Sequence, residues 1–358
     1  MKRIVAVHLL NDYSGSPKVL MQLLKIWTRN GFDTHLFTSG GRKGFLSDIP
    51  LVKTYSFWYH FSSNPLARLF NFFLSQFTLM MKLLFFLKKN DIIYINTVLP
   101  FGAAIAGKIK GCKIIYHIHE TSVKPKIFKQ FLFGVSKITS YKMVFVSEFL
   151  LNQEALIQNQ VILYNALESD FAKKADQFQN PEKTVKIVLM ICSLKMYKGV
   201  NEFFLLAQKN PQYIFKLVVN ASENEIKSYF LGKEMPKNLK IYPTQTDTHP
   251  FYQEASIILN LSHPDLWVET FGLTVLEGMR YKLPALVPPI GGVTELVEDD
   301  KNGFRINSKN SHELSEKLNF ILNNPSVYET FSNASYQKSL KFSDKYFEKE
   351  AVKIVSNL

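Results

Sequence analysis

The stretch that decides the fold reads ETFGLTVLEGM and occupies residues 269–279. Glu269 opens it, a Phe-Gly turn follows, and an apolar run that predicts the start of a helix leads to Glu277. Gly272 allows close backbone approach, and the free amide groups of a first helical turn favour a phosphate. Carboxylates accept hydrogen bonds from hydroxyl groups. A ligand that carries both groups, such as a nucleotide sugar, fits this segment.

Glutamates eight positions apart around an apolar run are commonly just solvated side chains. The neighbouring residues therefore have to show whether this segment binds a ligand. Ser262 stands upstream, and the downstream motifs are LPA at 283–285, GGVTE at 291–295 and DDKNGF at 299–304. In this order and spacing, over about a hundred residues, the chain resembles the donor-binding half of the retaining glycosyltransferases of family four, which have the GT-B fold.

The resemblance implies an α/β chain with two Rossmann-like parallel-sheet domains that face a central cleft. At 358 residues, 46% of them hydrophobic, the chain is long enough for two cores. We expect an acceptor-binding domain at residues 1–168, a polar linker at 169–183 and a donor-binding domain at 184–339. A C-terminal helix at about 340–358 is expected to pack back on the first domain.

Alternating runs in the first half support this fold independently. Strand-like Ile4–Leu10, Thr34–Thr38, Ile92–Asn96 and Lys113–His117 are separated by helix-like segments. Such Val- and Ile-rich runs are typical of parallel sheets that helices cover on both faces, whose ligands lie beyond the carboxyl ends of the strands. The sequence lacks Gly-x-Gly-x-x-Gly, which argues against a dinucleotide dehydrogenase.

The positive charge is concentrated in the first half. Residues 1–170 hold 20 Lys and Arg against 9 Asp and Glu, whereas residues 171–358 hold 23 against 21. Such a basic half suits an anionic lipid surface or a phosphorylated substrate. Nucleic acid is the weakest alternative, because zinc-finger spacing and RNA-recognition signatures are missing.

Cysteines and the N-terminus bear on the compartment. Cys112 and Cys192 lie far apart beside strand-like runs, which predicts buried thiols in a reducing compartment. The apolar stretch after Met1 is short and His8 interrupts it, so we interpret it as a first buried strand and not as a signal peptide. Together these features predict a cytoplasmic protein.

The resemblance assigns roles to residues of the second half. It implies that Glu269 binds the sugar hydroxyls, that Glu277 binds the ribose, and that Lys198 faces the diphosphate. Further donor-binding positions on this basis are Phe271, Gly272, Leu273, Thr274, Ser193 and Lys195. Ser193 stands where the family has an arginine, and Lys195 is the candidate to replace it. His263 and Asp265 lack a further ligand at suitable spacing, so we predict no metal site.

The first half supplies fewer candidates. Gly15 and Ser16 lie in the loop after the first strand, where the family usually has two adjacent glycines and an ordinary capped turn is the alternative. By resemblance His119 contacts the donor sugar and counts with Glu269 and Lys198 as catalytic, whereas His117 is structural. Lys124 and Lys126 are the acceptor-binding candidates, with a solvated face as the alternative.

Residues 66–89 form a long apolar stretch with polar residues at helical spacing. Lys82 and a polar group at nearly every turn argue against a membrane span. Two alternatives remain: a helix packed in the domain core, which we favour, and a helix that lies in a bilayer surface with its basic residues near the headgroups.

The predicted activity is hexose transfer from a nucleoside diphosphate sugar, with uracil or guanine as base, to a hydroxyl of a glycan or lipid-linked acceptor. The resemblance implies retention of configuration and no requirement for a metal or any cofactor beyond the donor substrate. Cell-surface polysaccharide synthesis, such as lipopolysaccharide or capsule, fits a peripheral protein at the inner face of the cell membrane.

Two rivals stay open. A nucleotide-sugar epimerase has the same architecture and needs no acceptor. A non-catalytic glycan-binding or membrane-associated protein of this fold is suggested by the missing arginine and the single glycine in the first loop.

Overall fold

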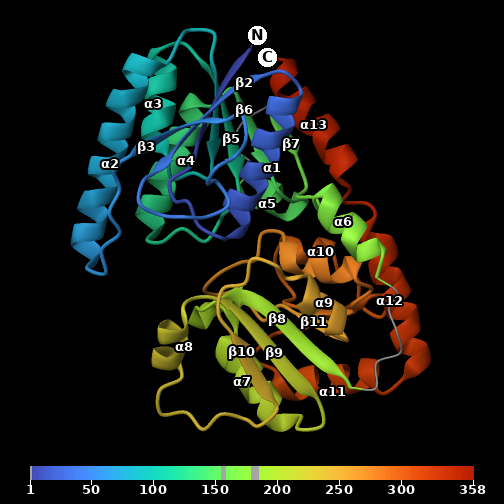
Figure 1. Ribbon diagram of the computed structural model, residues 1–358. Coiled ribbons are helices and arrows are strands. Elements are labelled where there is room, and N and C mark those ends of the chain that lie inside the picture. Colours follow the sequence, from blue (N-terminus) through green and yellow to red (C-terminus); the bar gives the residue numbers. More distant parts are fainter. Residues whose placement is uncertain (1, 155–158, 179–184) are drawn as a thin grey trace. The chain divides into compact units, whose positions relative to one another are not determined.

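The computed structural model describes residues 2–154, 159–178 and 185–358 (Figure 1). The chain divides into two compact units, of which unit 1 comprises Met1–Tyr164 and Tyr346–Leu358 and unit 2 comprises Asn165–Lys345. Each unit has its own parallel sheet with helices, so the predicted pair of Rossmann-like α/β domains is confirmed.

Unit 1 contains a seven-stranded sheet in the order β3-β2-β1-β4-β5-β6-β7, and all its strand pairs are parallel. Its strands are β1 (Arg3–Val7), β2 (Asp33–Ser39), β3 (Lys53–Phe57), β4 (Ile92–Asn96), β5 (Lys113–Ile118), β6 (Lys142–Phe145) and β7 (Gln160–Ile162). The central strands are buried along their length because helices cover both faces, which explains their Val- and Ile-rich sequences.

The helices of unit 1 are α1 (Gly15–Arg29), α2 (Pro65–Phe86), α3 (Phe101–Ile109), α4 (Lys126–Thr139), α5 (Glu148–Glu154) and most of α13 (Asp344–Ser356). Figure 1 shows α2, α3 and α4 on one side of the sheet and α1 and α13 on the other. Ring contacts join the first three: Phe101 of α3 lies 5.9 Å from Phe72 of α2 and 5.1 Å from Phe131 of α4.

The C-terminal helix α13 packs on α1. The indole Nε1 of Trp27 donates to the carbonyl of Ala351 at 3.1 Å, and the Arg29 guanidinium pairs with Glu348. Trp27 is fully buried, so α13 completes the core of unit 1. This helix begins at Asp344 and the preceding helix α12 (Pro325–Ser339) belongs to unit 2.

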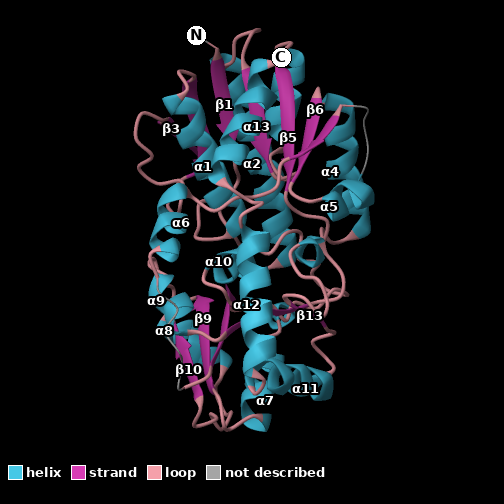
Figure 2. Cartoon of the chain, turned by 90° about the vertical axis from the view of Figure 1, so that its right-hand side faces the viewer, coloured by secondary structure: helices cyan, strands magenta, loops and turns pink. Residues whose placement is uncertain are grey.

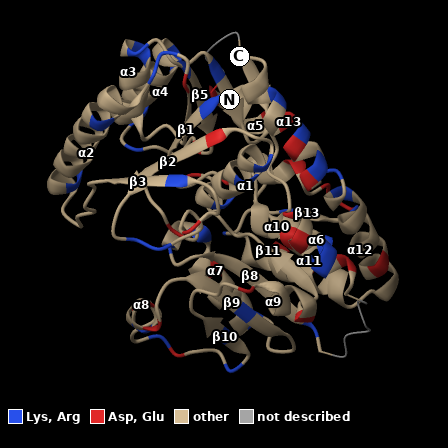
Figure 3. Cartoon of the chain, turned by 45° about the horizontal axis from the view of Figure 1, so that its top comes forward, with Lys and Arg blue, Asp and Glu red and all other residues tan. Residues whose placement is uncertain are grey.

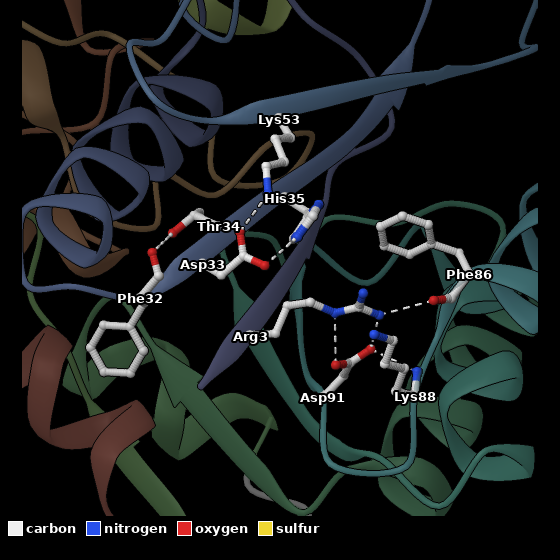
Figure 4. A network of polar contacts seen from close by, with 9 residues as sticks. All are labelled: Arg3, Phe32, Asp33, Thr34, His35, Lys53, Phe86, Lys88 and Asp91. Atoms are coloured by element: carbon white, nitrogen blue, oxygen red, sulfur yellow. Dashed lines mark hydrogen bonds and ion pairs between the residues drawn. The ribbon is translucent and has the colours of Figure 1, made fainter. Parts of the chain in front are cut away.

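A polar network fixes the end of α2 to the first strand (Figure 4). Arg3 of β1 donates from Nη2 to the carbonyl of Phe86 at 2.9 Å and from Nε to Asp91 Oδ1 at 2.8 Å. Asp91 also accepts the backbone N–H of Lys88 at 2.8 Å. The ion pair is largely shielded from solvent, and these contacts hold the C-terminus of α2 at the start of β1.

Unit 2 contains a six-stranded parallel sheet in the order β10-β9-β8-β11-β12-β13. Its strands are β8 (Ile187–Ser193), β9 (Ile214–Asn220), β10 (Leu239–Tyr242), β11 (Ile257–Leu259), β12 (Ala285–Val287) and β13 (Gly303–Arg305). Its other helices are α6 (Ser169–Asp176), α7 (Val200–Lys209), α8 (Glu223–Tyr229), α9 (His249–Glu254), α10 (Leu273–Arg280) and α11 (Ser311–Leu322), with 3-10 turns at Met196–Lys198 and Gly292–Glu295 (Figure 2).

The polar segment that suggested a linker starts with helix α6, which belongs to unit 2. Arg280 of α10 pairs with Asp176, the last residue of α6. Residues 179–183 of the predicted linker lie outside the described residues.

Candidate functional site

The segment at 269–279 folds as a loop that leads into α10. Gly272 is the N-cap of this helix and has φ +95°, a conformation that residues with a side chain rarely adopt. A Cβ at this position would lie 2.7 Å from Cγ2 of Val293. The first amides of α10, at Leu273 and Thr274, have no capping side chain, so they point out of the helix start as an anion-binding end requires.

Glu269 is the centre of a polar cluster. Its Oε2 accepts from Lys198 Nζ at 2.8 Å, from Asn260 Nδ2 at 3.2 Å and from Ser262 Oγ at 3.3 Å. Burial by itself would raise the pKa of this carboxyl, but the Lys198 ammonium and the three hydrogen bonds outweigh burial, and the pKa is lowered from its ordinary value. Glu269 is therefore a carboxylate at neutral pH.

A tight turn positions Lys198. It ends the 3-10 turn Met196–Lys198, and Gly199 follows with φ +77°. A Cβ on Gly199 would lie 2.2 Å from the carbonyl oxygen of Leu261, so only glycine fits between these two segments. The Lys198 ammonium lies 5.4 Å from the ring centroid of Trp267, which covers the ion pair from one side.

The other candidates near Lys198 are Ser193 and Lys195, which precede the turn. Ser193 is the last residue of β8, and its carbonyl accepts the backbone N–H of Lys195 at 2.8 Å. Lys195 is exposed before the turn, while Lys198 is the lysine that meets Glu269. Burial raises the pKa of the Cys192 thiol to about 12, so it stays neutral beside this pair.

The Gly291–Gly292 loop holds the Glu269 backbone in place. Glu269 and Gly291 form an isolated parallel bridge, and Gly291 has φ +124°. A Cβ on Gly291 would lie 2.4 Å from the carbonyl oxygen of Glu269. Close packing of these two backbones therefore sets the position of the carboxylate.

We expect Gly291→Ala to destabilise the protein by about 2 kcal/mol, from backbone strain and from the clash with Glu269. Urea unfolding followed by circular dichroism measures this loss. Gly232→Ala is the matched control, because Gly232 has φ +77° but nothing lies within 4 Å of its added Cβ. Equal losses in both variants would show that strain alone acts and that the bridge to Glu269 is loose.

Glu277 lies one helical turn into α10 and is nearly buried. Its Oε2 accepts the hydroxyl of Tyr252 at 2.6 Å. Tyr252, on α9, is fully buried, and burial together with the Glu277 charge holds its pKa well above the ordinary value. The phenol therefore remains a donor that orients the carboxylate. Tyr252 was not predicted from the sequence.

The side chain of Phe271 packs against another aromatic ring. Its ring is buried and lies 5.6 Å from the ring of Phe342 in an edge-to-face arrangement. The side chain thus anchors the loop to the core of unit 2, which leaves only its backbone for a ligand.

A second polar cluster lies in unit 1 at the carboxyl ends of β1, β4 and β5, which are neighbours in the sheet. Buried Asn96, the last residue of β4, is its centre. Its Nδ2 donates to the carbonyl of Ser16 at 3.1 Å and lies 3.1 Å from His8 Nδ1. Its Oδ1 lies 2.8 Å from Nε2 of His119.

These contacts determine the state of His119. Because the Ser16 carbonyl can only accept, the Asn96 amide turns its oxygen to His119, whose Nε2 therefore carries the proton. Burial first, and then His117 and His8, hold the pKa of His119 well below the ordinary value. His119 is thus a neutral imidazole with Nδ1 as its acceptor nitrogen.

Of the neighbours of His119, His117 is more deeply buried and Glu120 is partly buried like His119 itself. His117 is fully buried, and its Nδ1 lies 3.0 Å from the hydroxyl of Tyr94, which fits the structural role expected for it. Glu120 accepts the backbone N–H groups of Val98 and His119, yet burial raises its pKa to about 7.

Of the remaining unit 1 candidates, Gly15, Lys124 and Lys126 are exposed and Ser16 is half-buried. Gly15 is the first residue of α1 and nothing lies within 4 Å of an added Cβ, so its surroundings are open. Ser16 contributes its carbonyl to the Asn96 cluster. Lys124 and Lys126 are exposed at the start of α4, beside Ile127.

The residues rejected as metal ligands have separate neighbours. His263 Nε2 is 3.0 Å from Glu202, and Lys309 is 3.2 Å from Asp265. Within residues 2–154, 159–178 and 185–358, no three His, Cys, Asp or Glu side chains gather closely enough to hold a metal ion.

Comparisons with known proteins show which family and fold the chain is similar to. Residues 172–338 match the sequence profile of the glycosyl transferases group 1. An uncharacterized glycosyltransferase of Methanocaldococcus jannaschii is 23% identical over 263 residues, which are 71% of each chain.

Solved structures extend the similarity to the whole chain. HepE of Anabaena, solved in complex with UDP and glucose, has a TM-score of 0.79 at 20% identity, with all of both chains covered. WaaB, a lipopolysaccharide outer core galactosyltransferase, has a TM-score of 0.72 at 16% identity, again over all of both chains. At these identities the likeness concerns the fold. The chain therefore has the GT-B fold, and its residues 172–338 are similar to the glycosyl transferases group 1.

Proposed function

We propose that this chain is a retaining glycosyltransferase that moves a hexose from a nucleoside diphosphate sugar to a hydroxyl of a glycan or lipid-linked acceptor. The observation that carries the proposal is Glu269, which pairs with Lys198 and lies four residues before the uncapped helix start at Leu273, with buried Glu277 one turn further along the helix. A cation, backbone amides and two carboxylates then match the diphosphate and the hydroxyl groups of such a donor.

The chemistry depends on the leaving group. As the bond between the sugar and the diphosphate breaks, negative charge builds up on the phosphate oxygens. The amides of Leu273 and Thr274 and the Lys198 ammonium are suited to stabilise that charge without a metal ion. We therefore propose metal-independent transfer that needs no cofactor besides the donor.

Glu269 and Glu277 would orient the donor. The Glu269 carboxylate accepts sugar hydroxyls, and Glu277, held by Tyr252, accepts the ribose hydroxyls. In unit 1, His119 is the residue to which the family resemblance assigns a contact with the sugar. Retention follows in this proposal from attack on the face that the diphosphate leaves, with a phosphate oxygen taking the proton of the acceptor hydroxyl.

A uridine diphosphate donor and an acceptor in cell-surface polysaccharide synthesis are supported by the fold neighbours, which include a UDP complex and a lipopolysaccharide galactosyltransferase. Free Cys112 and Cys192 fit the reducing cytoplasm, where we place the protein.

The test is a panel of UDP- and GDP-hexoses incubated with the full-length protein, with and without glycan acceptors. We expect acceptor-dependent release of one nucleoside diphosphate, without added metal, and a product whose anomeric configuration matches the donor by NMR. Conversion of the donor to its epimer without acceptor would identify an epimerase instead. Donor binding without turnover over the whole panel would favour a non-catalytic protein.

We expect Tyr252→Phe to weaken donor binding about tenfold, because Glu277 loses the hydrogen bond that orients its buried carboxylate. The KM for the donor should rise while kcat changes little. Tyr213→Phe is the control, since its buried hydroxyl also donates, to Asn319 at 2.7 Å, away from this cluster. An unchanged donor KM in Tyr252→Phe would remove Glu277 from the donor site.

A further inference from the structure

The outer face of α2 is an exposed apolar stripe. Eight large apolar side chains are exposed along Pro65–Phe86 and recur every three or four residues: Leu66, Leu69, Phe70, Phe73, Leu74, Phe77, Met81 and Phe85. Phe70, Phe77 and Phe85 are 68%, 55% and 87% exposed. A stripe of this length and aromatic content on a soluble surface is typical of an interaction site.

The buried face of α2 is the less apolar one. It consists of Phe72, Ser75, Gln76, Leu79 and Leu83. Gly102 of α3 packs so tightly against it that an added Cβ would lie 2.2 Å from the Gln76 carbonyl oxygen. The Gln76 side chain also accepts the N–H of Gly102 at 3.2 Å. These contacts fix which side of the helix faces outward.

The favoured prediction for this segment, a helix packed in the domain core, therefore holds for one face of α2 only, because the opposite face is exposed. Its polar residues at helical spacing mark two faces: Ser75 and Gln76 bond within unit 1, while Arg68 and Lys82 are exposed. The sequence pattern alone did not separate the buried stripe from the exposed one.

The apolar surface continues onto α4. The ring of Phe73 lies 6.1 Å from that of Phe131, which is itself partly exposed on α4. Ile127 and Ile138 on the same helix are 80% and 74% exposed. We call the exposed apolar side chains of α2 and α4 the α2–α4 surface.

The charge around this surface has one sign. Residues 49–147 hold 13 Lys and Arg but only two acids, Asp91 and Glu120. Asp91 is buried and pairs with Arg3, and Glu120 is partly buried and accepts backbone N–H groups. In Figure 3, α2 carries blue positions and no red ones. Exposed Arg68, Lys82, Lys88, Lys89 and the predicted acceptor residues Lys124 and Lys126 border the stripe.

We infer that the α2–α4 surface docks on an anionic lipid bilayer, with its aromatic side chains among the acyl chains and its basic residues at the headgroups. Exposed Phe and Leu beside Lys and Arg are the combination that binds such a surface. A second copy of the chain fits poorly, because a symmetric contact would bring basic residues against basic residues.

The helix lies on the bilayer and does not cross it. By length and composition α2 is the one helix of the described residues that meets the criteria for a membrane span. However, crossing would remove Gln76 from Gly102 and Phe86 from Arg3, and would carry Arg68 and Lys82 into the hydrocarbon. An interfacial position keeps these contacts and leaves the charges at the surface.

The test is flotation of the full-length protein with vesicles of phosphatidylcholine containing 30 mol% (about one third) phosphatidylglycerol, a composition with strong negative surface potential. We expect the protein to bind these vesicles, and to bind them less as salt is added. Binding to vesicles of phosphatidylcholine alone should be weaker. Phe70→Ser/Phe77→Ser/Phe85→Ser should lower the partition coefficient about tenfold or more, and Arg68→Glu/Lys88→Glu/Lys89→Glu should remove the salt-dependent part.

The matched control carries three substitutions on exposed apolar residues of unit 2, Leu205→Ser/Leu231→Ser/Phe320→Ser, and should float like the wild type. Donor turnover by the Phe70 triple variant in detergent-free solution should stay unchanged, which separates this inference from the proposed function. Wild-type protein that stays unbound at low salt, or triple variants that float normally, would overturn it. So would concentration-dependent dimerisation that the Phe70 triple variant abolishes.

Discussion

Glu269→Gln is expected to lower kcat/KM for glycosyl transfer about 100- to 1,000-fold, the scale seen when one group that stabilises a transition state is removed. The amide keeps the size of the side chain and one oxygen that accepts from Lys198, Asn260 and Ser262. It removes the negative charge that faces the sugar as positive charge develops there. Initial rates with the donor identified by the panel measure the effect.

Two observations qualify the Glu269→Gln result. Circular dichroism and the melting temperature should show that the variant folds, because its hydrogen-bond partners are retained. Glu298→Gln is the control: this half-exposed carboxylate of unit 2 pairs with Lys301 and Lys338, and its loss should leave transfer unchanged. Undiminished transfer by Glu269→Gln would show that Glu269 is a structural partner of Lys198 and nothing more.

Lys198→Met is expected to lower kcat about 100-fold, because the charge on the departing diphosphate loses its cation. It should also change the pH dependence. In the wild type, burial would raise the pKa of Glu269, but Lys198 and the hydrogen bonds lower it. Without Lys198 the effect of burial is opposed only by Asn260 and Ser262, so the pKa of Glu269 rises.

The sign of the pH effect follows from this. Transfer requires the ionised carboxylate, so activity falls as the pH drops through the pKa of Glu269. In Lys198→Met this acidic limb should move to higher pH than in the wild type. Lys195→Met, which removes an exposed lysine three residues earlier, should leave the limb in place. A limb that does not move, or moves to lower pH, would contradict the electrostatic role of Lys198.

Much of the fold was predictable because buried parallel strands have continuous apolar sequences. Ile92–Asn96 was predicted with the bounds that β4 has, and Thr34–Thr38 lies within β2. The edge strand β3, KTYSF, was missed, since four of its five residues are at least partly exposed and it has no such run. For α2, hydrophobicity located the helix but not its outward face, which depends on packing against Gly102.

The site residues that are close in sequence were predictable, whereas those brought together only by the fold were not. Glu269, Gly272 and Glu277 lie within nine residues of each other, so local spacing was enough to propose them. Asn96 and Tyr252 reach their partners only through strand order and helix packing, from residues 23 and 25 positions away in sequence. A polar residue that ends a buried strand, as Asn96 does after Ile-Ile-Tyr-Ile, is the signal that would have found the first.

The central claim is that unit 2 presents the start of α10, Lys198 and two carboxylates to a nucleoside diphosphate sugar. A crystal structure of the protein soaked with the donor from the panel tests it most directly. The account predicts diphosphate oxygens within hydrogen-bond distance of the Leu273 and Thr274 amides and of Lys198 Nζ, with the ribose hydroxyls on Glu277. A donor bound with its phosphates away from α10, or with its ribose away from Glu277, would contradict it.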